Sequence, residues 1–299
     1  MEFCLQLPGS TSNLGPGFDA LGLALTIYNR VRIRTRSDTR LTLSIEGEGK
    51  GSLPEDHTNL FFQSAKSAAS KIGKSLPGLD VIMENNVPLA RGLGSSSTVI
   101  VAGIMTANHL FYDSLSKAEV LDFANEQEGH PDNVSPCVYG GLTISSICEG
   151  SVSCVRAQPP SELRAVVAIP EFEMQTKAAR AAIPNEIPLQ DATFNISRAC
   201  LVTSALLTGN LSALRHGMQD RVHQPYRSPL IPGFDRVLEA ALSAGALGGA
   251  LSGAGPSLLA FATDHADKIG RKMIEAWRAE GIQARAEILN IDPNGATLE

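Results

Sequence analysis

The feature that most constrains this chain is a glycine- and serine-rich segment placed directly before a long apolar stretch. Residues 91–98 read Arg-Gly-Leu-Gly-Ser-Ser-Ser-Thr, and VIVAGIMTANHLF follows at once. A helix that begins here presents unpaired N–H groups and a partial positive charge, and glycine lets the backbone approach an anion closely. Two interpretations are open: a turn whose last hydroxyl caps a buried helix, or a backbone cradle for a phosphate. The segment matches neither G-x-x-x-x-G-K-S/T nor G-x-G-x-x-G, so taken alone it favours the capped helix.

Length and charge narrow the class of protein. A chain of 299 residues exceeds the usual size of one domain, so we expect two domains that share a cleft. A net charge of −6 argues against a protein that binds nucleic acid. One basic run, RVRIRTR at 30–36, alternates arginine with Val31, Ile33 and Thr35. This period is that of a half-buried strand with a solvated face, which we favour over an anion-binding patch.

Cysteine usage and hydropathy predict the compartment. The five cysteines are odd in number and form no C-x-x-C pair, and the six histidines are scattered. They indicate reduced thiols, with neither a disulfide framework nor a zinc site. The N-terminal residues lack the basic and apolar regions of a signal peptide, and the apolar runs stop well short of the about 18 residues that a membrane span needs. We therefore expect a cytoplasmic protein with no membrane partner.

Hydrophobic periodicity predicts an α+β chain in two halves. Strands are expected at Phe3–Leu7, at 24–36 and 40–46 as a pair, and at 78–88, 164–170, 257–262 and 284–289. Helices are expected at 60–72 with Asn59 as cap, 98–112, 117–128 with Ser116 as cap and Glu119 in a capping box, 176–182, 191–208, 210–222, 234–243 and 264–280. The polar, proline-bearing stretch 150–163 marks a boundary, which divides the chain into domains 1–155 and 156–299.

Two further glycine-rich stretches favour the phosphate-cradle interpretation of the 91–98 segment. They are PGSTSNLGPGFDALGLAL at 8–25 and GALGGALSGAGPSLLAF at 245–261. Together, the three resemble the three motifs of the galactokinase, homoserine kinase, mevalonate kinase and phosphomevalonate kinase (GHMP) superfamily, in the family order. EGHPDNVSP at 128–136 and DRVHQPYRSPLIPG at 220–233 make the homoserine kinases the most similar branch. The chain departs from the family pattern with PGSTSN in place of P-A-T-S-A-N and with SSST in place of SSAA, and both departures exchange small residues.

The resemblance implies a two-domain GHMP kinase fold, with a ribosomal-S5-like N-terminal domain and a ferredoxin-like C-terminal domain. It also implies Mg²⁺, and ATP bound by the 91–98 segment. The implied ATP-binding residues are Asn59, Pro88, Leu89, Ala90, Arg91, Gly92, Leu93, Gly94, Ser95, Ser96, Ser97 and Thr98. Ser96 matches the magnesium-ligating hydroxyl of the family, and its alternative role is a helix cap. The second magnesium ligand is a glutamate before HPDN, for which we prefer Glu126 to Glu128.

The implied activity is phosphorylation of the γ-hydroxyl of L-homoserine to O-phospho-L-homoserine, a step of threonine biosynthesis. An amino acid needs an acidic partner for its ammonium, an arginine for its carboxylate and a polar group to orient it. Positions that match the substrate contacts of the family are Asn13, Asp19, His130, Asp132, Asn133, Thr176, Arg180 and Arg227. Taken singly, each is also an ordinary turn former, cap or solvated arginine.

The implied mechanism lacks a strong protein base. Some relatives have an aspartate and a lysine that deprotonate the alcohol, but Asn133 occupies the matching aspartate position and the first motif holds no lysine. The hydroxyl proton is then expected to pass to the phosphate or to solvent. The catalytic set is Ser96, Glu126, Asn133 and Arg180. Two alternatives stay open: a GHMP kinase for another amino alcohol such as L-threonine, and a non-catalytic ligand-binding relative. The resemblance also allows a homodimer.

Overall fold

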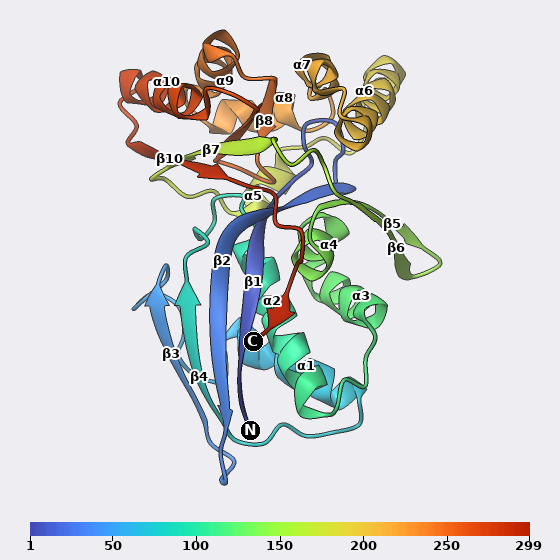
Figure 1. The fold of residues 1–299 in the computed structure, drawn as a ribbon, viewed down its shortest axis with the longest axis vertical. Coiled ribbons are helices and arrows are strands. Elements are labelled where there is room, and N and C mark those ends of the chain that lie inside the picture. The colour runs from blue at the N-terminus through green and yellow to red at the C-terminus, as the bar shows by residue number, and fades with distance from the viewer.

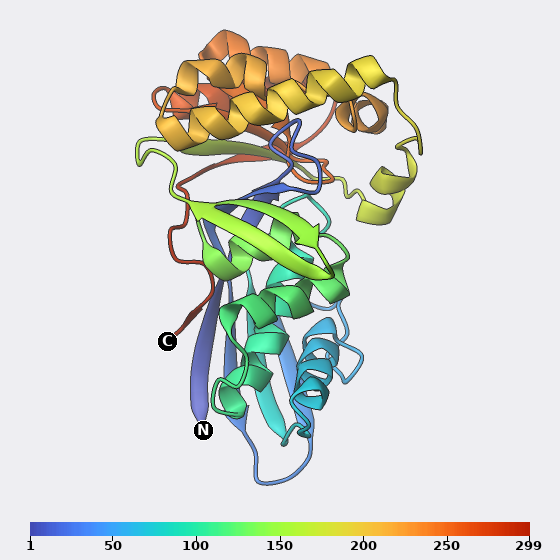
Figure 2. The same cartoon turned by 90° about the vertical axis from the view of Figure 1, so that its right-hand side faces the viewer.

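The computed structural model describes residues 1–299 as two α/β domains stacked end to end (Figures 1 and 2). The first is built on a seven-stranded sheet of order β11-β1-β2-β4-β3, in which β5 also pairs with β2 and β6 pairs with β5. Its strands are β1 Glu2–Ser12, β2 Leu21–Thr35, β3 Leu41–Gly47, β4 Leu79–Asn85, β5 Leu142–Cys148, β6 Ser151–Ala157 and β11 Thr297–Leu298.

The strand order corrects one prediction. Residues 24–36 and 40–46 were expected to pair, but β4 lies between β2 and β3 and is parallel to β3. The basic run of β2 behaves as a solvated strand face, as expected. Arg32 and Arg34 are exposed and pair with Glu84 and Asp80 of β4, at 3.0 and 2.7 Å.

The other face of the first sheet is covered by four helices: α1 Leu60–Lys71, α2 Ser95–Leu110, α3 Lys117–Glu128 and α4 Pro131–Tyr139 (Figure 2). Asn59 caps α1, and Ser116 with Glu119 forms the capping box of α3, so both caps are confirmed. Helix α2 is buried along most of its surface, which accounts for its apolar sequence. Helix α4 was not predicted, because it has nine residues and contains Pro136.

The second domain has a four-stranded antiparallel sheet of order β10-β7-β9-β8, with α9 and α10 on one face. This is the ferredoxin-like order that was expected. Its strands are β7 Arg164–Pro170, β8 Gly248–Leu251, β9 Leu258–Ala262 and β10 Ala284–Leu289. Its helices are α5 Thr176–Ala181, α6 Leu189–Thr208, α7 Leu214–Gly217, α8 Gln224–Arg227, α9 Phe234–Ala244 and α10 Ala266–Ala279, with short 3-10 turns at Leu211–Ala213 and Ser228–Leu230.

The single helix expected at 210–222 is wrong. Only the 3-10 turn Leu211–Ala213 and the short α7 form there, and the side chain of Asp220 accepts backbone N–H bonds from Val222, His223 and Gln224. A carboxylate that binds the following N–H groups competes with helix continuation and favours a turn. This turn positions the short helix α8 and its Arg227.

The two domains share a hydrophobic core. One buried cluster joins Leu14, Leu23 and Leu93 of the first domain to Val167 and Phe261 of the second. The division after residue 155 stays a proposal, and the structure modifies it in two ways. Strand β6 continues to Ala157, and the C-terminal strand β11 returns to pair with β1 (Figure 1). None of the helices combines the length and the apolar character needed to cross a membrane.

Candidate active site

The 91–98 segment forms a tight loop that ends at the start of α2. Gly92 and Gly94 have φ of 70° and 71°, and no side chain caps the helix. A Cβ at Gly94 would lie 2.3 Å from Ser10 Oγ, and one at Gly92 would lie 2.0 Å from Ser252 O. Glycine is therefore required at both positions by conformation and by close approach. The first N–H groups of α2 have no partner within the helix, an arrangement that favours the binding of an anion.

This loop borders a cavity of about 500 Å³, which is in the range of small-molecule sites. Both domains line it. The expected residues among its lining are Asn13, Asp19, Asn59, Pro88, Leu89, Ala90, Arg91, Gly92, Leu93, Gly94, Ser95, Ser96, His130, Asp132, Asn133, Thr176, Arg180 and Arg227. The structure thus gathers the implied nucleotide and substrate residues around one space, although they come from distant parts of the chain.

The third glycine-rich motif, within residues 245–261, packs against the loop of residues 91–98, named the phosphate loop from here on. Ser252 Oγ donates a hydrogen bond to the carbonyl oxygen of Gly92 at 2.7 Å. The carbonyl oxygen of Gly253 accepts bonds from Asn13 Nδ2 at 2.9 Å and from Arg227 at 3.2 Å. The turn therefore connects the phosphate loop to two residues of the implied substrate site.

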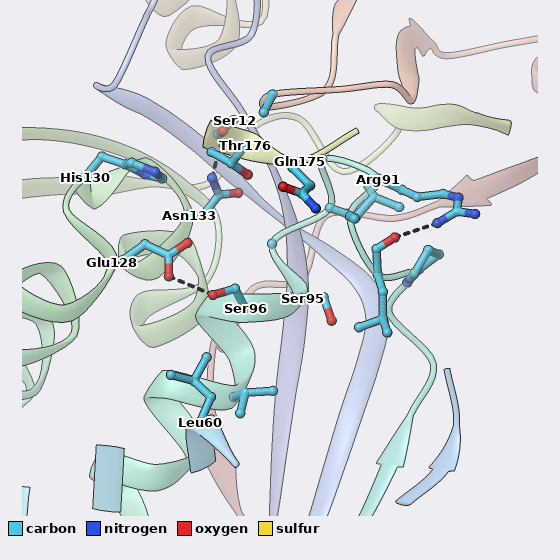
Figure 3. A pocket seen from close by; sticks show the side chains of 18 of the residues that line it. Ser12, Leu60, Arg91, Ser95, Ser96, Glu128, His130, Asn133, Gln175 and Thr176 are labelled. Carbon is cyan, nitrogen blue, oxygen red and sulfur yellow. Dashed lines mark hydrogen bonds between the residues drawn. The ribbon is translucent and has the colours of Figure 1, made fainter. Parts of the chain in front are cut away.

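The glutamate beside Ser96 is Glu128, so the geometry favours Glu128 over the preferred Glu126 for the predicted second magnesium ligand. Ser96 Oγ donates to Glu128 Oε2 at 3.0 Å, and Ser97 Oγ donates to Glu128 Oε1 at 3.2 Å (Figure 3). Glu126 lies outside the cavity, where it is exposed and paired with Lys71 at 3.0 Å. Burial raises the pKa of Glu128 and outweighs the lowering effect of His130 and the two serine hydroxyls.

Three of the expected ATP-binding residues, Ser97, Thr98 and Arg91, have side chains that are bonded to other groups of the protein. Thr98 Oγ1 accepts from Asn29 Nδ2 at 2.8 Å and donates to the Ser95 carbonyl at 2.7 Å, so its side chain lies beneath the loop. The side chains of Ser97 and Thr98 are both buried and do not line the cavity. Ser95, in contrast, lines the cavity, and its Oγ is buried without a hydrogen-bond partner.

Arg91 is the third of these residues. Its guanidinium donates to the carbonyl oxygens of Pro170 at 2.8 Å and Leu89 at 2.6 Å, and also to that of Glu171. It also pairs with Glu173 at 3.3 Å. Arg91 thus joins the loop to the end of β7 in the second domain, and its donors are already used by the protein.

One side of the cavity is apolar and was not predicted. It is lined by Leu53, Pro54, Leu60, Met83 and Val99. Asn59 lies at this side, but its side chain is held by the protein. Its Oδ1 accepts from the Phe61 N–H at 2.9 Å, and its Nδ2 donates to the Pro54 carbonyl at 2.7 Å. The sequence signal was weak, because these apolar residues are spread over a loop, two helices and a strand.

Polar residues from the first domain fill the opposite side. His130 Nδ1 lies 2.7 Å from Asp132 Oδ1. Asn133 Nδ2 donates to Ser12 Oγ at 3.0 Å, and Asn133 Oδ1 accepts from Ser10 Oγ at 2.9 Å (Figure 3). Burial alone would lower the pKa of His130, but the hydrogen bond and the charge of Asp132 raise it. Ser10 and Ser12, which sequence reasoning did not single out, fix the orientation of the Asn133 amide.

Charged residues from both domains complete the site. Arg180 of α5 makes a bidentate ion pair with Asp19, with distances of 2.9 and 2.7 Å. Arg227 is buried and donates to the carbonyl oxygens of Ala179 and Gly253. Burial and the nearby charge of Arg180 lower the pKa of Arg227 to about 10, so its guanidinium is charged at neutral pH.

Arg227 also contacts a buried histidine that was not predicted. Its Nη1 lies 3.3 Å from His223 Nδ1, and His223 Nε2 lies 2.7 Å from the Gly15 carbonyl oxygen. Since a carbonyl oxygen only accepts, Nε2 carries the proton and Nδ1 accepts from Arg227. Phe18 stacks on His223 with ring centroids 5.2 Å apart.

Comparisons with known proteins agree with this geometry. The models of the GHMP kinases N terminal domain and of the GHMP kinases C terminal region match residues 59–141 and 202–279. The homoserine kinase of Desulfitobacterium hafniense is 39% identical over 98% of this chain and 99% of its own length. That of Trichormus variabilis is 43% identical over 98% and 97%.

Two solved structures show the same fold. The homoserine kinase of Cytophaga hutchinsonii superimposes with a TM-score of 0.91 at 33% identity, covering 100% of this chain and 97% of that one. The galactokinase of Lactococcus lactis superimposes with a TM-score of 0.76 at 15% identity, over 99% and 95%, and shows similarity of fold alone. The expected two-domain kinase architecture is confirmed.

Proposed function

Because the chain belongs to the GHMP kinases, and within them to the homoserine kinase family, we propose that it transfers the γ-phosphoryl group of ATP to the side-chain hydroxyl of L-homoserine. The product is O-phospho-L-homoserine. The observation that carries the proposal is that one cavity holds a phosphate-binding helix N-terminus together with acidic and arginine side chains matched to an amino acid.

The residues at the phosphate end fit Mg²⁺. Magnesium prefers oxygen ligands and is usually held by one or two protein groups together with substrate phosphates. The Ser96 hydroxyl and the Glu128 carboxylate lie side by side at the first turn of α2 and supply such oxygens. No group of three or more His, Cys, Asp or Glu side chains is placed to hold a metal, which suits an ion that arrives with a nucleotide. A bound Mg²⁺ would neutralise charge on the phosphates.

The protein groups around the phosphates bind and orient them. The free N–H groups at the start of α2 lie at the end of the cavity that the β- and γ-phosphates would occupy. The apolar side, with Leu60 and Val99, offers a surface for the adenine base. Water exclusion there would strengthen the polar contacts at the phosphate end.

The substrate end supplies partners for each group of homoserine. Asp19, Asp132, Arg180 and Arg227 line the cavity, where the two aspartates would face the ammonium and the two arginines the carboxylate. The γ-hydroxyl would then lie toward Asn133, whose amide has no basicity and is oriented by Ser10 and Ser12. Phosphoryl transfer through a loose transition state depends mainly on position and charge stabilisation, so the hydroxyl proton passes to the phosphate or to solvent.

The compartment is a further proposal. All five cysteines are unpaired in the structure, and one of them, Cys137, is fully buried. Unpaired thiols are typical of proteins kept in a reducing compartment, which supports a cytoplasmic location.

The proposal is tested by ADP formation from Mg-ATP with a panel of acceptors. L-Homoserine should be the best acceptor, with L-threonine and 4-hydroxybutyrate much poorer. A faster reaction with threonine would support the alternative of a threonine kinase in the same family. ATP binding without ADP formation on any amino alcohol would support a non-catalytic relative. Intact Ser96 and Glu128 beside the loop argue against the latter.

A further inference from the structure

Asp19 and Arg180 form an ion pair that joins the two domains at the cavity. Asp19 lies in the loop between β1 and β2, where its N–H donates to Asn13 Oδ1 at 3.0 Å. Arg180 lies in α5 of the other domain. Both side chains line the cavity and are partly exposed, and the pair is bidentate at 2.9 and 2.7 Å. Without a substrate, each of these two residues is therefore satisfied by the other.

The pair has the same two charges as the head group of an amino acid. We propose that the Asp19–Arg180 pair is a specificity latch, which opens without loss only for a ligand that carries both an ammonium and a carboxylate. This inference rests on the proposed function, since it assigns the two charges to the two ends of an amino alcohol. Such a latch would select zwitterions over alcohols that carry a single charge.

The exchange of partners explains the selection. When an amino acid enters, its ammonium replaces Arg180 beside Asp19, and its carboxylate replaces Asp19 beside Arg180. No charge is left without a partner. A ligand with a carboxylate alone takes Arg180 and leaves Asp19 unpaired next to a like charge. A ligand with an amine alone leaves Arg180 unpaired. Loss of one charge-assisted partner weakens binding by about ten- to a hundredfold.

Phe18 keeps Arg180 in place when the latch opens. The guanidinium carbon atoms of Arg180 and Arg227 each lie 5.3 Å from the centroid of the Phe18 ring. This is within the distance at which a guanidinium is attracted to an aromatic face. The open form therefore presents two neighbouring guanidinium groups to one carboxylate. Asp19 balances their like charges in the closed form, and the substrate carboxylate balances them in the open form.

The latch predicts that removal of one charged residue strengthens the binding of one analogue. The probes are L-homoserine, 4-hydroxybutyrate, which lacks the amine, and 3-amino-1-propanol, which lacks the carboxylate. Calorimetry on the full chain without nucleotide measures each dissociation constant. In Asp19→Asn, Arg180 is released, so 4-hydroxybutyrate should bind at least about fivefold tighter than to the wild type, while homoserine binds about tenfold weaker. Asparagine tolerates the positive φ of 56° at this position.

The mirror variant is Arg180→Gln, which releases Asp19. Here 3-amino-1-propanol should bind at least about fivefold tighter than to the wild type, and homoserine about tenfold weaker. Because Arg180 lies on a short, partly exposed helix, this variant keeps the test open if Asp19→Asn does not fold. The matched control is Asp191→Asn, which breaks the Asp191–Arg221 pair of 3.2 Å outside the cavity and should leave all three dissociation constants unchanged.

Gains of this kind separate a latch from two ordinary binding residues, whose loss only weakens binding. If neither analogue binds its variant tighter than the wild type, the latch is wrong, even when homoserine is turned over normally. If both gains are seen but the wild-type chain does not phosphorylate homoserine, the latch stands and the proposed substrate falls. The two failures are therefore distinguishable.

Discussion

Ser96 Oγ lies 3.0 Å from Glu128 Oε2, and this contact joins the first turn of α2 to the last residue of α3. The two residues are separated by 31 intervening positions of α2, α3 and their connection, yet they meet beside the free N–H groups that we assign to the phosphates. In the proposed kinase, these two oxygens would ligate Mg²⁺.

Glu128→Gln should lower turnover by about a hundredfold or more, since loss of even an outer partner of a metal ligand costs ten- to a hundredfold. The activity should be partly recovered at high Mg²⁺. Glu126→Gln, which removes only the exposed pair with Lys71, is the control and should stay within about twofold of the wild type. The measurement is the steady-state rate of each variant as a function of Mg²⁺ concentration. A larger loss of turnover in Glu126→Gln than in Glu128→Gln would assign the ligand role to Glu126.

The same variant should not destabilise the ligand-free protein. Burial raises the pKa of Glu128, so the folded state holds this proton more tightly than the unfolded state does. The stability of the folded protein is therefore highest below the unfolded pKa of about 4.3 and falls as pH rises through the folded pKa. Glutamine does not ionise, so Glu128→Gln should not show this loss of stability at neutral pH. The melting temperature of Glu128→Gln at pH 7 should equal or exceed that of the wild type, and a clear decrease would show that the charged form supports the fold.

Arg227→Ala should raise KM for homoserine by at least about tenfold and leave KM for ATP nearly unchanged, because it removes a charge-assisted partner of the carboxylate. The buried guanidinium also bonds the carbonyl oxygens of Ala179 and Gly253, so Arg227→Lys is a second variant that keeps the charge. Arg221→Ala, at the exposed pair outside the cavity, is the control. Equal effects on both KM values would show that Arg227 supports the fold and does not bind the homoserine carboxylate.

His223 should act as a positioning residue for Arg227. Its Nδ1 accepts from the guanidinium, so His223→Leu should raise KM for homoserine by about tenfold, and His223→Asn, which keeps an acceptor near that place, should lose less. The measurement is the pair of KM values for homoserine and ATP in each folded variant. Equal losses for leucine and asparagine would contradict the positioning role.

The pH dependence of stability tests the neutral state of His223. Burial lowers its pKa, against the opposing charge of Asp220, and Arg227 lowers it further. A histidine with a depressed pKa contributes stability that is present above the unfolded pKa of about 6.5 and lost as pH falls toward the folded pKa. Thermal unfolding from pH 8 to 5 should show a steeper loss in the wild type than in His223→Asn. His130, whose pKa is raised, is present in both proteins and cancels in this comparison. Identical slopes would show that His223 is not held neutral.

Asn133→Asp should lower kcat by about tenfold or more. A carboxylate here would add negative charge near the γ-phosphate and would lose the bond from the amide to Ser12, and no rate gain from a base is expected where transfer depends on position and charge. Initial rates at saturating homoserine and ATP check this. A rate above that of the wild type would mean that the reaction is limited by proton removal.

Local features of the sequence predicted local structure well. The caps at Asn59 and Ser116 depend on contacts within a few residues, and both form as expected. The insertion of β4 between β2 and β3 depends on a pairing across the whole of α1, which periodicity does not report. Helix α4 was missed because Pro136 suggested a break.

The sequence contained information that distinguishes Glu128 from Glu126. In α3 the buried positions include Leu121 and Ala124, and Glu128 follows Ala124 by one helical turn. Glu126 and Glu119 are instead exposed. Helical periodicity thus favoured Glu128, whereas alignment of motifs favoured Glu126. The partners of Arg91 and His223, in contrast, come from distant segments and required the structure.

The central claim is tested most directly by competition in one reaction. The wild-type chain, Mg-ATP and equal concentrations of L-homoserine and L-threonine are incubated, and the phosphorylated products are identified by ³¹P NMR. The account predicts a phosphate ester on the γ-oxygen of homoserine. This ester should form at least about a hundredfold faster than any ester of threonine. Predominant phosphothreonine, or no ester of either amino acid while ATP still binds, would contradict it.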